Sequence, residues 1–226
     1  MKTRVKICCI SSIDEAQLAI REGADAVGLV GAMPSGPGPI PDKKIAEIAR
    51  DIPPGVSCFL LTSETTVSGI AEHLLRTGVA TVQLVQHLSI AETMALDRVL
   101  LSTRRVQVIH IEGPESLDLI EKYEPYVHAF LLDSGRPNAD TPELGGTGRT
   151  HDWDLSRQFV EKSKKPVFLA GGLTPDNVQE AILKVRPFGV DVCSGVRTNG
   201  HLDPKKLNDF MAAIRTATPI STCSWI

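Results

Sequence analysis

The sequence predicts one α/β domain, a single (β/α)8 barrel of the TIM type, and three observations support this fold class. The chain has 226 residues, and one such barrel usually takes about 250 residues, with a lower end of about 200. Eight strand-like segments alternate with helix-like segments from one end to the other. The residues are 42% hydrophobic but only 4% aromatic, which suits a barrel interior filled by aliphatic side chains.

Each predicted strand is a short aliphatic or β-branched run, and a segment with helical periodicity follows it. This order predicts consecutive βα units with parallel strands. An open doubly wound sheet usually has about six strands, whereas eight units that fill a chain close more naturally into a barrel. The predicted strands are Arg4–Ile10, Ala26–Val30, Ser57–Leu61, Thr81–Val85, Gln107–Glu112, His128–Asp133, Val167–Gly171 and Gly189–Ser194.

Helices are predicted in the intervals, and several begin at a recognisable N-cap. Ser12, Ser89 and Thr174 each precede a helical segment, and Pro175 stands at the first helical position after Thr174. A Ser or Thr hydroxyl there accepts a hydrogen bond from the first turn, and proline suits the position. These residues predict where the helices begin.

Two long loops rich in glycine and proline follow the second and sixth predicted strands, at residues 31–41 and 134–152. Both are predicted to lie at the C-terminal face of the barrel, where catalytic loops are found. We expect the barrel to span residues 1–216. Residues 217–226 have no periodicity and are predicted to form an appended tail.

The charge pattern favours a small-molecule partner. The net charge is −3, and no run of Lys and Arg is present, so neither nucleic acid nor a membrane surface is an expected partner. The apolar stretch at the N-terminus is too short for a signal peptide, which predicts a cytoplasmic protein. Monomer and homodimer both remain open.

The five cysteines are an odd number without the spacing of a metal site or a disulfide framework, so we expect reduced thiols and no metal. Cys8 and Cys9 are adjacent at the end of the first predicted strand. Because side chains alternate across a strand, their thiols are expected to point to opposite faces.

Glycine-rich turns close the last three βα units and predict a phosphate site. In a barrel, the loops after strands seven and eight commonly hold phosphate with backbone N–H groups, and glycine lets the backbone approach an anion closely. Ordinary turn glycines are the alternative at any single turn. The candidate phosphate-binding residues are Gly146, Gly148, Gly171, Gly172, Ser194 and Gly195.

Two residues at strand ends are candidates for acid–base chemistry. Cys8 lies near the end of the first strand and Asp133 ends the sixth, so both are expected at the same mouth of the barrel. Such chemistry needs two groups whose pKa values are moved toward neutrality, and Lys6 would favour the Cys8 thiolate. The alternatives are a small buried cysteine and an aspartate that caps a turn.

Other polar residues have plainer interpretations. His110, His128 and His151 are possible proton carriers, but hydrogen-bonded or solvated histidines are expected. Asp191 and Cys193 alternate on the eighth strand, and either one fits a packing layer of the barrel.

Several motifs, taken in order, resemble the phosphoribosylanthranilate isomerase family, whose members carry out an Amadori rearrangement in tryptophan biosynthesis. The matching segments are VKICCI (5–10), GADAVGLV (23–30), VQL (82–84), LLDS (131–134), GGTGRTHDW (145–153), LAGGLTPDNV (169–178) and GVDVCSGV (189–196). The resemblance implies that Cys8 is the general base and Asp133 the general acid. It also implies a phosphorylated substrate, ring opening to a Schiff base, proton removal at C2, an aminodeoxyribulose phosphate product, and no cofactor or metal.

The chain departs from the family pattern where the aromatic carboxylate would be recognised. The family's Ser-Pro-Arg is replaced by the loop that starts at Ser35, which has no arginine, and its VQLHG histidine by Val85. Cys9 stands for a glycine and Arg197 for a glutamate. The departures leave three hypotheses open: the isomerase itself, an isomerase for another phosphorylated sugar or amino sugar, and a non-catalytic phosphometabolite-binding barrel.

Under the first hypothesis, another arginine must supply the missing carboxylate contact. Arg136 is the first candidate because it lies three residues beyond Asp133. Arg197 is the second because it follows a phosphate turn, and Arg149, at the family's lysine position, is a further possibility.

Overall fold

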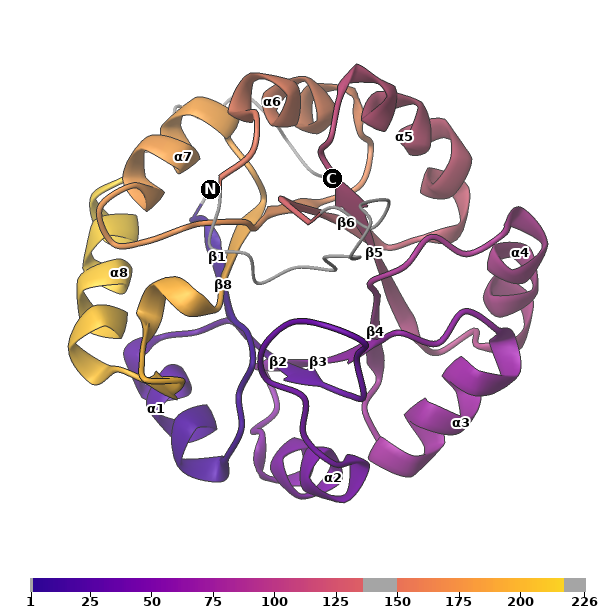
Figure 1. The fold of residues 1–226 in the computed structure, drawn as a ribbon, viewed down its shortest axis with the longest axis horizontal. Helices are drawn as coiled ribbons and strands as arrows, with labels where there is room; N and C mark the ends of the chain where they lie inside the picture. Colours follow the sequence, from indigo (N-terminus) through magenta and orange to yellow (C-terminus); the bar gives the residue numbers. More distant parts are fainter. Residues whose placement is uncertain (1, 136–149, 218–226) are drawn as a thin grey trace.

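The computed structural model describes residues 2–135 and 150–217 and contains a closed barrel of eight parallel strands (Figure 1). Each strand pairs with the next, and β1 also pairs with β8, which closes the sheet. The predicted fold class is therefore confirmed. The barrel strands are β1 (Arg4–Ile7), β2 (Ala26–Val30), β3 (Ser57–Thr62), β4 (Thr81–Leu84), β5 (Arg104–His110), β6 (Ala129–Asp133), β7 (Val167–Leu169) and β8 (Gly189–Val192).

Helices surround the barrel and cover its outer face (Figure 1). The N-caps fit the sequence: Ser12 and Ser89 each accept a hydrogen bond from the backbone three residues on. The expected cap at Thr174 is different, because α7 begins four residues later, after Asn177. The helices are α1 (Ile13–Glu22), α2 (Asp42–Asp51), α3 (Val67–Thr77), α4 (Ile90–Val99), α5 (Asp118–Tyr123), α6 (Trp153–Lys162), α7 (Val178–Val185) and α8 (Pro204–Thr216), with 3-10 turns η1 (Pro114–Leu117), η2 (Glu124–Tyr126) and η3 (Ser194–Val196).

Every barrel strand except β2 differs from the predicted bounds by one to three residues at one end or both. β1 stops at Ile7 and β8 at Val192, both earlier than expected, whereas β5 begins at Arg104, three residues before the predicted Gln107. Cys9 has a positive φ of 62°, and this left-handed conformation cannot continue a strand. β1 and β8 lie side by side, so their last predicted residues become part of the mouth of the barrel.

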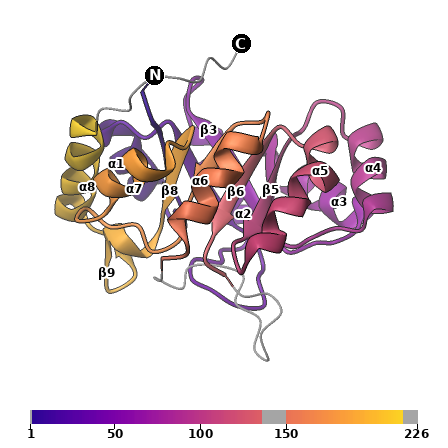
Figure 2. The same cartoon turned by 90° about the horizontal axis from the view of Figure 1, so that it is seen from above.

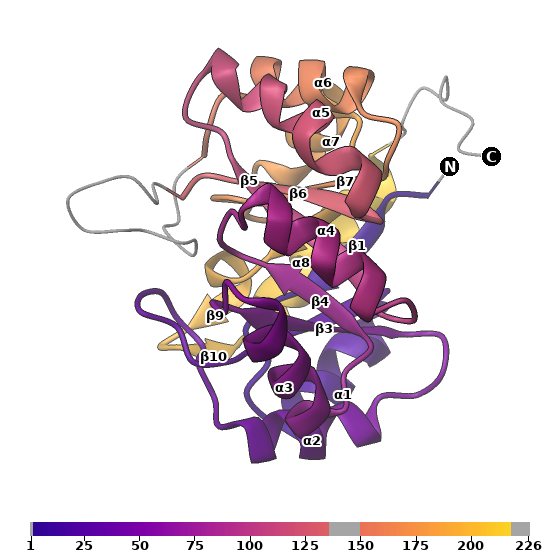
Figure 3. The ribbon, with the colours of Figure 1, turned by 90° about the vertical axis from the view of Figure 1, so that its right-hand side faces the viewer.

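A small hairpin after β8 was not predicted. It consists of β9 (Arg197–Thr198) and β10 (His201–Leu202), and its turn residues Asn199 and Gly200 have positive φ values of 51° and 81°. An Asn-Gly pair is the typical sequence of such a two-residue turn, so the signal was present. The hairpin and the loop after β2 lie at the same end of the barrel (Figures 2 and 3).

The apolar side chains form two layers. The larger cluster packs the outer face of the sheet against the helices, and the smaller one fills the barrel with residues such as Phe59 and Phe168, whose rings meet edge to face with centroids 6.0 Å apart. This interior forms a floor beneath the mouth. Among the described residues, no helix is long and apolar enough to cross a membrane. The tail from residue 217 stays a prediction, since residues 218–226 are not described.

Candidate active site

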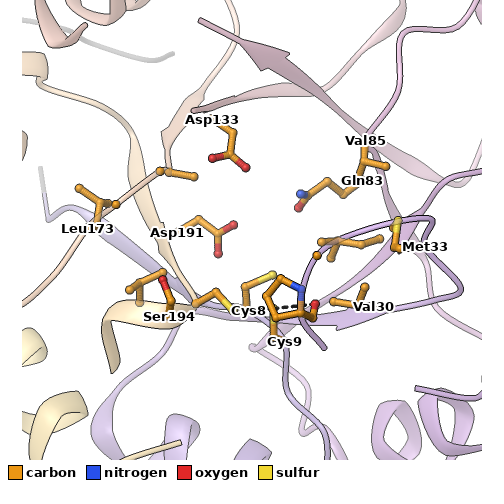
Figure 4. A pocket seen from close by; sticks show the side chains of 18 of the residues that line it. Cys8, Cys9, Val30, Met33, Gln83, Val85, Asp133, Leu173, Asp191 and Ser194 are labelled. Atoms are coloured by element: carbon orange, nitrogen blue, oxygen red, sulfur yellow. Dashed lines mark hydrogen bonds between the residues drawn. The ribbon is translucent and has the colours of Figure 1, made fainter. Parts of the chain in front are cut away.

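A cavity opens at the C-terminal ends of the strands, where active sites of such barrels lie (Figure 4). Its walls come from the segments after β1, β2, β4, β7 and β8 and from strand residues that include the last residue of β6. Cys8 and Asp133 both line it, and so do Asp191 and Ser194. The structure therefore brings the two predicted acid–base residues into one cavity.

Cys8 follows directly after β1 and is held there by the neighbouring strand. Its backbone N–H donates to the Val192 carbonyl at 2.8 Å, and its side chain is buried, at 5% exposure. A hydrogen bond from Cys9 lowers the pKa of the Cys8 thiol, burial opposes this, and the Lys6 ammonium lowers the pKa further. Stabilisation of the thiolate is what a cysteine needs to act as a base.

Asp133 ends β6 and has the opposite shift. Burial raises the pKa of its carboxyl to about 6, and the nearby Asp191 adds to the rise. The Ser134 backbone N–H donates to Asp133 Oδ1 at 2.7 Å, which lowers the pKa but only in part. A carboxyl that keeps its proton to higher pH is suited to act as a general acid.

A buried ion pair lies beneath these groups. The Lys6 ammonium donates to Asp191 Oδ2 at 2.8 Å, and the two side chains are 0% and 7% exposed. Burial disfavours the charged lysine, but Asp191 and the Cys8 sulfur outweigh it and raise the pKa of Lys6. Lys6 is thus a fixed positive charge next to the thiol, as predicted, and Asp191 has a charge-pairing position rather than a simple packing one.

Gly28 makes room for this cluster and was missed by the sequence analysis. A Cβ on Gly28 would lie 2.9 Å from both Cys8 Sγ and Lys6 Nζ. A glycine inside a buried strand often marks such a close approach, so its place in β2 was the available signal.

The predicted phosphate turns face the same cavity. Gly171, Gly172 and Ser194 line it, and both glycines have positive φ, 81° and 63°. A Cβ on Gly195 would collide with the Leu173 carbonyl oxygen, so the loops after β7 and β8 touch there. Gly146 and Gly148 lie outside the described residues.

Asn177 braces the first of these loops, which the sequence analysis did not anticipate. Its amide donates to the Gly172 carbonyl at 2.9 Å and accepts from the Thr174 N–H at 2.8 Å. The bracing fixes the loop without using the N–H groups of Gly171 and Gly172.

The three arginine candidates have different outcomes. Arg136 and Arg149 lie outside the described residues. Arg197 does not line the cavity: it pairs with Glu15 at 3.0 Å and donates to the Cys9 carbonyl at 2.6 Å. It therefore ties the hairpin to α1 and to the loop after β1.

The expectation that Cys8 and Cys9 point to opposite faces is wrong. Both residues line the cavity, because β1 has already ended and Cys9 is in a left-handed conformation that turns its side chain. The Cys9 sulfur lies 3.6 Å from the Pro37 carbonyl oxygen. This places the loop after β2 against the cysteine pair.

None of the three candidate histidines lines the cavity. His110 Nε2 lies 3.3 Å from the Val85 carbonyl oxygen, His128 Nδ1 accepts from the Arg105 N–H, and His151 Nε2 is 2.7 Å from Ser156 Oγ. These are the hydrogen-bonded histidines that were expected. Among the described residues, no group of three or more potential ligands could hold a metal ion.

Comparison with known proteins gives a consistent result. Residues 5–213 match the family described as N-(5'phosphoribosyl)anthranilate (PRA) isomerase. N-(5'-phosphoribosyl)anthranilate isomerase 2 of Methanosarcina mazei is 36% identical over 210 residues, 92% of each chain. The enzyme of Haloarcula marismortui is 39% identical over 199 residues, 88% of this chain and 89% of its own. The crystal structure of phosphoribosyl anthranilate isomerase from Thermotoga maritima superposes with a TM-score of 0.80 at 28% identity, over 94% of this chain and 98% of that one.

Proposed function

Because the chain belongs to the N-(5'-phosphoribosyl)anthranilate isomerase family, we propose that its isomerase reaction proceeds by proton transfer from Asp133 and to Cys8 across the cavity. The chain is an isomerase of tryptophan biosynthesis that binds a phosphorylated substrate. One observation carries the assignment of residues. A thiol with a lowered pKa and a carboxyl with a pKa of about 6 reach one cavity from different strands.

The proposed chemistry uses the two groups in sequence. Protonated Asp133 donates to the ribose ring oxygen, and the ring opens to a Schiff base. The Cys8 thiolate then removes the proton at C2, which gives the enolamine and, after tautomerisation, the aminodeoxyribulose phosphate. Lys6 balances the thiolate charge before the proton arrives.

The glycine turns after β7 and β8 are the proposed phosphate site. Gly171, Gly172 and Ser194 present their backbones at the cavity, and unpaired backbone N–H groups at such turns favour anions. The site lies at the ends of β7 and β8, which stand between β6 and β1 in the barrel. A substrate held there by its phosphate would extend over the mouth between Asp133 and Cys8.

The proposed function is tested with purified protein by following the loss of phosphoribosylanthranilate fluorescence, and by growth of a tryptophan auxotroph that carries the gene. We expect turnover without added metal or cofactor, and growth without tryptophan. A protein that is folded but gives neither turnover nor growth would contradict the proposal.

The pH dependence of kcat/KM is expected to be bell-shaped, with one limb near pH 6. Asp133 must be protonated to act as an acid, so its contribution falls as the pH rises through about 6. Cys8 must be deprotonated, so its contribution rises through the thiol pKa. Cys9→Gly removes the hydrogen bond that lowers this pKa, and glycine fits the positive φ of 62°.

In Cys9→Gly the limb due to Cys8 should therefore move to higher pH while the limb near pH 6 stays in place. Cys58→Ser is the matched control, since Cys58 does not line the cavity. If both limbs stay where they are in Cys9→Gly, the Cys8 limb is wrongly assigned.

Ser194→Asp is expected to weaken phosphate binding by placing a carboxylate among the anion-binding turns. Loss of about 1.5–3 kcal/mol, the value of a hydrogen bond to a charged group, raises KM by about 10- to 150-fold. Inhibition by inorganic phosphate should weaken in parallel. Ser68→Asp, on the exposed start of α3, is the control. If phosphate inhibits both variants equally, the phosphate site is not in the loops after β7 and β8.

Arg136 is the proposed partner of the anthranilate carboxylate. No Lys or Arg is among the described residues that line the cavity, and Arg197 is engaged by Glu15. Arg136→Ala should raise KM by the equivalent of about 1.5–3 kcal/mol with a smaller effect on kcat. Arg149→Ala is the matched comparison. If KM is unchanged in Arg136→Ala, Arg136 does not bind the anthranilate carboxylate.

A further inference from the structure

Three thiols meet at the seam where the barrel closes. Cys9 follows the end of β1, and Cys193 follows the end of β8, the neighbouring strand. Their sulfur atoms are 2.6 Å apart, although 184 residues separate them in sequence. Cys9 is the sequence neighbour of Cys8, and all three cysteines line the cavity, so the Cys9–Cys193 pair lies next to the proposed base.

We propose that Cys9 and Cys193 are a site of reversible oxidation, and that the disulfide between them switches off the proton transfer at Cys8. The bond itself is independent of the proposed function, whereas its effect on activity depends on Cys8 acting as the base.

The backbone around the two residues is suited to a disulfide. β1 and β8 pair in register up to Ile7 and Val192, and the Cys8 N–H still bonds to the Val192 carbonyl. Neighbouring strands lie about 4.8 Å apart, and a disulfide joins Cα atoms separated by about 4.4–6.8 Å. Continuing this register sets Cys193 opposite Cys8, with Cys9 one residue further along. The left-handed turn at Cys9 is what accompanies its sulfur being next to that of Cys193.

The difference in solvent exposure between the two thiols predicts the order in which they react with a small disulfide. Cys9 is buried at 7% exposure, whereas Cys193 is only partly buried and lines the cavity. A small disulfide such as oxidised glutathione therefore reaches Cys193 first. The Cys193 thiolate attacks it, forms a mixed disulfide and releases one glutathione thiolate. Cys9 then attacks the Cys193 sulfur and releases the second glutathione, which takes up the Cys9 proton.

This exchange converts two protein thiols and one small disulfide into one protein disulfide and two small thiols. The second step is expected to be slow, because hydrogen bonds with Cys193 and Cys8 together with burial raise the pKa of the Cys9 thiol, and the thiolate is the attacking form. Uncatalysed exchange of this kind takes minutes to hours.

Oxidation would change Cys8 without touching it covalently. In the reduced protein, the Cys9 hydrogen bond is the largest of the influences that lower the pKa of Cys8. A Cys9 sulfur in a disulfide has no proton to donate. The Cys8 thiolate then loses its main stabilising partner, and activity near neutral pH falls about tenfold for each unit by which the thiol pKa rises.

The test uses the purified full chain, incubated with oxidised glutathione and then with dithiothreitol. We expect the intact mass to fall by two hydrogen atoms with loss of two free thiols. kcat/KM should fall on oxidation, by about tenfold for each unit by which the Cys8 pKa rises, and recover on reduction. Each variant is compared with its own reduced form. Cys193→Ser should keep its activity after oxidant removal, and Cys58→Ser should lose activity as the wild type does.

Peptide mapping under non-reducing conditions identifies the bonded pair. The linkage to Cys193 should persist in Cys8→Ser and disappear in Cys9→Ser. If Cys193 is still disulfide-bonded in Cys9→Ser, or if the wild type keeps all its free thiols after oxidation, Cys9 and Cys193 are not the oxidation site. If the Cys9–Cys193 disulfide forms but kcat/KM is unchanged, the disulfide does not regulate activity. Inactivity of the fully reduced protein would instead contradict the proposed function.

Discussion

Asp133→Asn is expected to lower kcat by about 10²- to 10⁴-fold, the usual contribution of a general acid. Asparagine has nearly the same shape but no proton to give to the ring oxygen. The Cys8→Ala variant should lose activity to a similar extent, because it removes the base. The loss is measured by the decline of substrate fluorescence under saturating substrate.

The stability of Asp133→Asn separates a catalytic role from a structural one. The folded state raises the pKa of this carboxyl from 3.8 to about 6, so it binds the proton more tightly than the unfolded chain does. The stability due to this group is present at low pH and is lost as the pH rises through about 6. At pH 7 the variant should therefore have a Tm equal to or above that of the wild type.

An Asp133→Asn variant with near wild-type turnover would show that another group donates the proton. A large drop in Tm would show that the carboxyl serves the fold. Asp209→Asn, which removes an exposed carboxylate paired with Lys205 on α8, is the control for loss of charge alone.

Lys6→Met is expected to destabilise the protein by about 3–5 kcal/mol, the cost of leaving one partner of a buried ion pair unpaired. Asp191 is 7% exposed, and its Oδ1 atom has no hydrogen-bond partner within residues 2–135 and 150–217, so the ammonium is its compensating charge. For a chain of this size, such a loss lowers Tm by about 6–20 °C. Urea unfolding and thermal melts measure it.

The double variant Lys6→Met/Asp191→Leu distinguishes the pair from simple packing. Replacing both charges by apolar side chains is often neutral for stability, so most of the lost Tm should return. The pKa of Cys8 should not return to its lowered value, because Lys6 is one of the groups that lower it. If the double variant is as unstable as Lys6→Met, the effect comes from the shape of the lysine chain rather than from its charge.

The barrel could be predicted from sequence because its signals are local. Each strand is a short aliphatic run, and a cap such as Ser12 lies just before its helix. Strand ends were less predictable at the mouth of the barrel. Cys9 has a positive φ, which ends β1 early, and its sulfur contacts the loop at Pro37. Nothing next to Cys9 in the sequence indicates either feature.

The candidate site also contains residues that local sequence predicts and residues that depend on distant contacts. Cys8 and Asp133 could be placed at one mouth because both end a strand of a barrel whose order was known. The Lys6–Asp191 pair joins residues 185 positions apart. Alternation along a strand predicts which face of the sheet a side chain is on, but it does not predict which residue of another strand it pairs with. Arg197 was expected near the substrate because it follows a predicted phosphate turn. It forms an ion pair with Glu15 instead, which is 182 residues earlier in the sequence.

The proposed base and the Lys6–Asp191 ion pair lie on the seam between the first and last strands, and this position ties the proposed base to completion of the chain. During synthesis, Cys8 and Lys6 emerge first and wait for β8 to supply Asp191 and the backbone acceptor at Val192. A partly made or truncated barrel that lacks β8 holds the thiol without the neighbours that set its reactivity. The thiol therefore acquires the surroundings that the proposed role requires only when β1 and β8 have paired.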